Sequence, residues 1–168
     1  MPNKFLRYCC NSDLVIYCFR CIIGFLIGYE LYLSFPKYEL FWTIISIMLV
    51  ISPEEKDARR LTIERVKANL IGSSVGLVCF LLLIRQEYMI LLGIILTSLI
   101  CHFFKLMNVA RTAVVALIIV IFHEQTEMSY WAAVERFASV ALGCLIGLGI
   151  TVITGYLFRF LKDKLTID

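Results

Sequence analysis

The sequence predicts an all-α integral membrane protein whose six transmembrane helices form two inverted three-helix repeats. Composition is the first observation behind this prediction: of 168 residues, 61% are hydrophobic and only 17% are charged, and the mean hydropathy is +0.88. Water-soluble domains carry about 25% charged residues, so this composition indicates a chain that lies in a membrane. The apolar stretches approach helical membrane-spanning length and lack the alternation of barrel strands, which favours helices.

An internal repeat is the second observation. In segment 52–77, SPEEKDARRLTIERVKANLIGSSVGL, a charged run passes into an apolar run without a turn, so water and lipid are expected to meet near Asn69. Five of its residues recur 71 positions later: Glu64, Arg65, Gly72, Gly76 and Leu77 match Glu135, Arg136, Gly143, Gly147 and Leu148. Gly-xxx-Gly spacing alone is common where membrane helices pack, but the preceding Glu-Arg pair is not a packing feature. A three-span unit repeated once must return inverted.

Six apolar segments follow one another in a membrane domain at 13–160. They are expected at 14–33, 38–51, 69–84, 88–104, 109–122 and 137–158, with turns at 85–87 and 105–108 and an acidic outer loop at 123–134. The second and fifth segments are short against the roughly 20 residues that a bilayer core needs. Short segments at corresponding positions of two repeats point to a substrate path.

The distribution of Lys and Arg sets the expected orientation. With the N-terminus in the cytoplasm, twelve Lys and Arg outside the spans face the cytoplasm, and three, Lys37, Arg85 and Arg136, face outward. We therefore expect a cytoplasmic N-terminal segment at 1–12, a charged cytoplasmic stretch at 53–68 and a basic cytoplasmic tail at 161–168. The expected location is the bacterial inner membrane, and no cleavable signal peptide is predicted.

Ionisable side chains within or beside the spans are the candidate functional residues. A charged group at the bilayer centre costs about 2.5–3.5 kcal/mol, so those that persist tend to face a bundle interior or an aqueous cavity. Converging arginines would bind a carboxylate bidentately and select anions, whereas the alternative is that they snorkel to the headgroups. The predicted path comprises Arg20, Glu30, Arg65, Lys67, Asn69, Arg111 and Arg136. The predicted helix-packing positions are Gly24, Gly28, Gly72, Gly76, Gly143 and Gly147.

Four stretches carry a family resemblance: PKYELFWTIISIMLVISPE, ERVKANLIGSSVGL, RTAVVALIIVIF and YWAAVERFASVALGCLIGL. Together they resemble the fusaric acid resistance (FUSC) and aromatic acid exporter family of bacterial membrane proteins, over about 22–158. The matching features fall at Trp42, at Gly72, Ser73 and Gly76 with Arg65 upstream, and at Arg136 with Gly143. Many members carry an Arg where this chain has Asn69. The resemblance implies export of aromatic carboxylic acids or related toxic organic anions.

Three function classes follow. We prefer a bacterial inner-membrane transporter or exporter of small organic anions. The second class is an anion channel, which needs the same fold without a coupling group. The malate-type anion channels of plants are distantly similar to the family. The third class is a non-transporting membrane scaffold or lipid-binding protein, in which 54–67 docks a partner.

The expected partners are membrane lipid, a small organic anion and a second copy of the chain in a homodimer or higher homo-oligomer. Nucleic acid is not expected, because the basic residues form no aromatic-interleaved groove. The sequence shows no catalytic, nucleotide or metal motif, so we predict no enzyme, no cofactor and no metal site. Cys9, Cys10, Cys18 and Cys21 lie toward the end that is placed in the cytoplasm and are expected to be reduced. Cys18-x-x-Cys21 lacks a second pair at ligand spacing, so these two are expected to be small apolar helix residues rather than part of a metal or redox motif.

Overall fold

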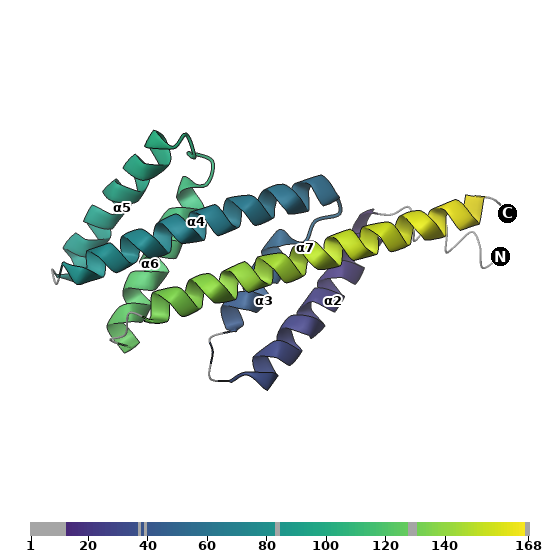
Figure 1. Ribbon diagram of the computed structural model, residues 1–168, viewed down its shortest axis with the longest axis horizontal. Coiled ribbons are helices and arrows are strands. Elements are labelled where there is room, and N and C mark those ends of the chain that lie inside the picture. The colour runs from purple at the N-terminus through teal and green to yellow at the C-terminus, as the bar shows by residue number, and fades with distance from the viewer. Residues whose placement is uncertain (1–12, 37, 39, 83–84, 128–130, 167–168) are drawn as a thin grey trace. The chain divides into compact units, whose positions relative to one another are not determined.

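The computed structural model describes residues 13–36, 38, 40–82, 85–127 and 131–166, and the side chains of 123–127, 131–133 and 161–166 lie outside that description. These residues form helices α2 (Asp13–Ser34), α3 (Phe41–Val50), α4 (Glu55–Leu81), α5 (Gln86–Phe103), α6 (Ala110–Glu127) and α7 (Trp131–Thr166) (Figure 1). The described part of the chain is therefore all-helical, as the sequence predicts. The predicted N-terminal segment, 1–12, lies outside the described residues, as do the side chains of the predicted tail.

Three of the described helices are long and apolar enough to cross a membrane: α2, α5 and the Val134–Phe160 part of α7. Helix α3 and the Ala110–Phe122 part of α6 are apolar but shorter. At about 1.5 Å per residue, the ten residues of α3 span roughly half of a hydrocarbon core about 30 Å thick. The six crossings expected from the sequence remain a prediction.

Helices α2 and α5 carry mostly small or polar residues on their buried faces and large apolar residues outside. The buried positions of α2 are Arg20, Gly24 and Gly28, and those of α5 are Met89, Gly93, Thr97 and Cys101. Large hydrophobic side chains on the same helices, such as Phe25 and Ile95, are exposed. This distribution suits a lipid environment, because lipid tails accept apolar side chains while close helix packing needs small ones.

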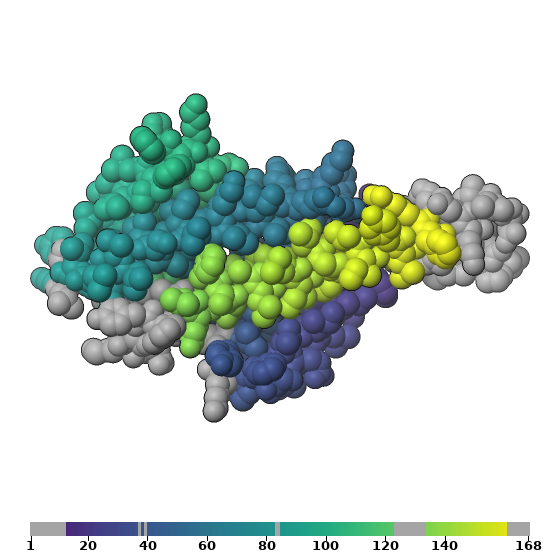
Figure 2. Space-filling model, viewed as in Figure 1, coloured from purple at the N-terminus to yellow at the C-terminus, as the bar shows by residue number. Residues whose placement is uncertain are grey.

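The chain divides into two compact units. The first comprises Met1–Thr62 and Leu142–Asp168, and the second comprises Ile63–Ala141. Within the first unit, α2 packs against α3, and the C-terminal part of α7 lies directly against α2 (Figure 2), with Phe19 and Phe158 in edge-to-face contact at 6.0 Å. Within the second unit, α5 packs against α6. Helices α4 and α7 each contribute residues to both units.

Helix α4 begins much earlier than the apolar segment that the sequence predicts. The predicted span starts at residue 69, but the helix starts at Glu55 and includes most of the charged stretch 53–68. Glu, Lys, Arg and Ala are strong helix formers. Exposed ion pairs one turn apart, Arg59 with Glu55 and Arg60 with Asp57, also favour helix here. The expected boundary between water and lipid is therefore not the beginning of a helix.

The expected outer loop is longer than the connection that the structure shows, whereas one expected turn agrees with the structure. Most of the predicted outer loop, 123–134, is helical, because α6 extends to Glu127 and α7 begins at Trp131. The predicted turn at 105–108 agrees with the gap between α5 and α6. There Lys105 has φ 55°, and the amides of Leu106 and Lys105 donate to the carbonyls of Cys101 and His102. This pattern is the Schellman motif, which satisfies the last carbonyls of α5.

Candidate functional site

A cavity of about 670 Å³ lies in the first unit, where α2, the beginning of α4 and the C-terminal part of α7 meet. Its basic lining residues are Arg20, Lys56, Arg59 and Arg159, and its acidic ones are Asp13, Glu54 and Glu55. Ile16 and Phe158 add apolar surface. Pockets that bind small molecules have volumes of about 300–1,000 Å³ and combine apolar walls with a few polar groups, so this cavity is of suitable size and character.

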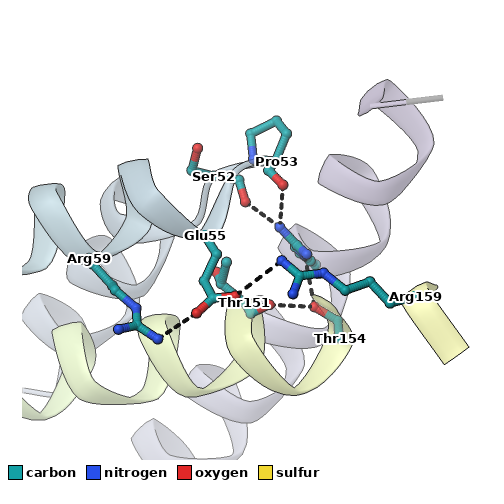
Figure 3. A network of polar contacts seen from close by, with 8 residues as sticks. Ser52, Pro53, Glu55, Arg59, Thr151, Thr154 and Arg159 are labelled. Carbon is teal, nitrogen blue, oxygen red and sulfur yellow. Dashed lines mark hydrogen bonds and ion pairs between the residues drawn. The ribbon is translucent and has the colours of Figure 1, made fainter. Parts of the chain in front are cut away.

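Arg20 is the buried cation of this cavity, with 3% of its surface exposed. Its Nε donates to Thr154 Oγ1 at 2.8 Å, and its Nη1 donates to the carbonyl oxygens of Ser52 at 2.5 Å and Pro53 at 2.8 Å (Figure 3). The Thr154 hydroxyl in turn donates to the Ile150 carbonyl at 2.6 Å. One side chain from α2 therefore fixes both the α3–α4 connection and α7.

The local sequence explains why carbonyls are available to Arg20. Helix α3 ends at Val50, and Ile51 leaves the helical conformation with φ −59° and ψ 127°. Pro53 has no N–H and disfavours helix in the residue before it, so the chain cannot continue as one helix into α4. The carbonyls of Ser52 and Pro53 therefore lie outside the helical ladders and accept from the guanidinium.

The charges around the cavity leave one positive charge in excess, since four lining residues are basic and three are acidic. Glu55 already pairs with Arg59 at 2.5 Å and with Arg159 at 3.6 Å. Among the described residues, Arg20 forms no ion pair and bonds to neutral oxygens only. Glu55 is the acidic group of the lining that interacts electrostatically with Arg20, and burial of the guanidinium remains costly.

The other predicted path residues lie outside this lining. Glu30 is exposed in the first unit, and the second unit holds exposed Lys67 and Arg111, half-buried Arg65, and buried Asn69 and Arg136. The described lining of the cavity includes Arg20 and none of these six.

Several residues of the site were not predicted as such. The run 54–67 is expected from the sequence to face the cytoplasm or to dock a partner, but its beginning lines the cavity. The sequence did not identify Thr154 as a site residue, because a threonine in a glycine-rich span looks the same as a residue that only packs against a neighbouring helix. Ser52 contributes through its backbone, which no side-chain pattern reveals.

Four of the predicted packing glycines bring helices together within the first unit. A Cβ at Gly24 would lie 2.8 Å from Ile47 Cγ2, and one at Gly28 would lie 3.1 Å from Ile44 Cγ1, so α2 lies close against α3. On α7, a Cβ at Gly143 would lie 2.5 Å from the Thr43 carbonyl oxygen, and one at Gly147 would lie 3.0 Å from the Ile47 carbonyl oxygen. These glycines let α7 approach the backbone of α3.

The remaining two packing glycines act in the same way within the second unit. A Cβ at Gly72 would meet the Ala113 carbonyl oxygen, with the Ala116 Cβ at 2.7 Å, and one at Gly76 would lie 2.8 Å from Val120 Cγ1. Helix α4 is therefore held close against α6.

Comparison with known proteins places the chain in a family. Residues 19–150 match the family described as fusaric acid resistance protein-like. No curated protein and no solved structure shows significant similarity to the chain. The matched range covers most of the chain and includes Arg20 and the start of α4, although it ends before Thr154. The chain therefore belongs to the fusaric acid resistance protein-like family, which comprises membrane transporters rather than enzymes.

Proposed function

We propose that this protein exports small organic anions, aromatic carboxylates among them, across the bacterial inner membrane. The observation that carries the proposal is the buried Arg20 guanidinium, which forms no ion pair with a described residue, at a cavity of about 670 Å³ lined by four basic and three acidic residues. A guanidinium binds a carboxylate through parallel N–H bonds, and it stays charged at any physiological pH. Membership of a family of membrane transporters supports the same conclusion.

The apolar part of the lining favours an aromatic substrate. Ile16 and Phe158 line the same cavity as Arg20, and Phe158 is held in place by its edge-to-face contact with Phe19. An aromatic ring gains from contact with such a wall, at about 0.5–1.5 kcal/mol for a well-oriented aromatic pair. A carboxylate at Arg20 with its ring against Phe158 would satisfy both parts of the lining.

The proposal includes six spans built as an inverted repeat whose halves exchange their third helices. Its support is the correspondence of contacts, each described within its own unit: Gly143 lies against Thr43 and Ser46, and Gly72 lies against Ala113 and Ala116. The glycines are 71 residues apart and their partners are 70 residues apart, so positions that correspond to within one residue make similar contacts. Helix α7, the third helix of the second repeat, packs on α3, the short second helix of the first repeat. Helix α4, the third helix of the first repeat, packs in the same way on α6, the short second helix of the second repeat.

The orientation expected from the positive-inside rule puts the cavity at the cytoplasmic side. The lining comes from the beginnings of α2 and α4 and from α7 near Arg159, all at cytoplasmic ends in that orientation. An exporter must collect its substrate there. Lys56 and Arg59 at the start of α4 would attract anions toward Arg20.

Transport by the full chain in proteoliposomes tests the proposal. Radiolabelled 4-hydroxybenzoate at pH 8 is expected to show saturable flux above that of protein-free liposomes, and excess phenethylamine should not compete. Arg59→Gln should raise the KM about two- to tenfold, because it removes a positive charge from the lining and leaves Glu55 with one basic partner fewer.

Arg85→Gln is the matched control. Arg85 is also an exposed arginine paired with a glutamate, Glu87, but it lies in the second unit, outside the lining. Its KM should equal that of the wild type. Equal KM values for the two variants would remove the cavity from the path, and flux no greater than that of protein-free liposomes would refute the function.

A further inference from the structure

Two buried polar side chains on α4 each have one atom without a hydrogen-bond partner among the described residues of the second unit. Asn69 is 4% exposed and Ser73 is 6% exposed. Asn69 Nδ2 and Ser73 Oγ form no hydrogen bond with any residue that the structure describes. Because residues four apart lie one above the other on a helix, these groups occupy neighbouring turns of one face.

The packing of α4 does not require these polar groups. Ala68, Val75 and Cys79 of the same helix join apolar clusters with residues of α5 and α6, and Gly72 provides the close approach to α6. From Leu70 to Leu82 the only polar residues are serines, Ser73 among them. Burial removes the hydrogen bonds that these two groups would make with water, and no described residue replaces them. This is unfavourable unless a ligand supplies the missing hydrogen bonds.

Other hydroxyl groups of the chain show that a partner is available within a helix. The Oγ1 atoms of Thr62, Thr151 and Thr154 donate to the carbonyl oxygens four residues earlier, at 2.8, 3.0 and 2.6 Å. The equivalent acceptor for Ser73 is the carbonyl of Asn69, and Ser73 does not bond to it. The Ser73 hydroxyl is therefore left available for a different acceptor.

We propose that Asn69 and Ser73 form a hydrogen-bonding subsite for the carboxylate of the exported anion, an inference that rests on the proposed function. The amide supplies two N–H donors and the hydroxyl supplies one O–H donor, which together match the oxygens of one carboxylate. Neither side chain is charged. The subsite therefore holds the anion weakly enough to release it, as passage through a membrane requires.

Three substitutions test the subsite in the full chain: Asn69→Leu, Ser73→Ala and, as a matched control, Thr97→Val. Thr97 on α5 is fully buried, and its Oγ1 also lacks a partner among the described residues. Each change removes an unmet polar group, so the melting temperature should rise in all three variants. The KM for 4-hydroxybenzoate in proteoliposomes should rise at least threefold in Asn69→Leu and Ser73→Ala, and it should stay unchanged in Thr97→Val.

The outcomes separate the subsite from the export function. Wild-type flux with unchanged KM in both α4 variants would overturn the subsite and leave the export proposal intact. Absence of wild-type flux would overturn both. A lower melting temperature with unchanged KM would show that water satisfies these groups, which also overturns the subsite. Ser73→Ala removes a single oxygen, so it keeps the test decisive if Asn69→Leu fails to fold.

Discussion

Replacing Gly143 with alanine is expected to destabilise the first unit by about 1–3 kcal/mol or more. The new Cβ would lie 2.5 Å from the Thr43 carbonyl oxygen and 2.7 Å from the Ser46 Cβ. One of these obstacles is backbone and the other is a Cβ, so neither can rotate away. Helices α7 and α3 would have to separate, and the contacts around Gly147 would weaken with them.

Gly149→Ala on the same helix is the matched control. A Cβ at Gly149 would have no neighbour within 4 Å. Alanine is about 0.5–1 kcal/mol more favourable than glycine inside a helix, so this variant should be as stable as the wild type or slightly more so. Thermal unfolding of the purified variants in detergent, followed by circular dichroism, provides the comparison. Equal melting temperatures for Gly143→Ala and Gly149→Ala would contradict the close α7–α3 packing.

Arg20→Gln is expected to lower both stability and transport. Three hydrogen bonds from the guanidinium connect α2 to Ser52, Pro53 and Thr154. Hydrogen bonds that involve a charged group contribute about 1.5–3 kcal/mol each, so the loss should be at least about 3 kcal/mol. The cavity also loses its buried positive charge, and we expect the flux of 4-hydroxybenzoate to fall at least about tenfold.

Two further variants separate the structural role of Arg20 from its role in binding. Thr154→Val removes the acceptor of Arg20 Nε but keeps the charge, so it should cost about 1–3 kcal/mol of stability and leave the KM close to that of the wild type. Arg20→Lys keeps the positive charge but lacks the planar set of N–H donors of a guanidinium. Its KM is expected to lie between those of the wild type and Arg20→Gln. If Thr154→Val loses as much transport as Arg20→Gln, Arg20 acts by holding the helices together rather than by binding the anion.

The helices were predictable from the sequence to the extent that they are apolar. Hydropathy identified α2, α3, α5, α6 and the apolar part of α7, because burial in lipid is a property of composition. It could not find where α4 begins. The stretch from Glu55 onward is polar and helical at once, and its helical state depends on propensity and on ion pairs such as Arg59 with Glu55. Hydropathy does not measure either effect.

The site was predictable only in its central residue. Arg20 stood out as a charge in an apolar run, which is unfavourable unless a partner or a cavity is present. Its acceptors at Ser52 and Thr154 are 32 and 134 residues away in the sequence. They become neighbours through helix packing at glycines such as Gly143 and through the break at Pro53, and one sequence without a structure does not show those contacts.

Photolabelling tests most directly whether the Arg20 cavity binds aromatic carboxylates. Purified full-length protein is irradiated with 4-azidobenzoate, digested and analysed by mass spectrometry. The expected label lies on the peptides that contain Ile16 or Phe158, which line the cavity beside Arg20, and excess 4-hydroxybenzoate but not phenethylamine should suppress it. Labelling that lies away from these peptides, or that the carboxylate fails to suppress, would contradict the assignment of the cavity as the anion site.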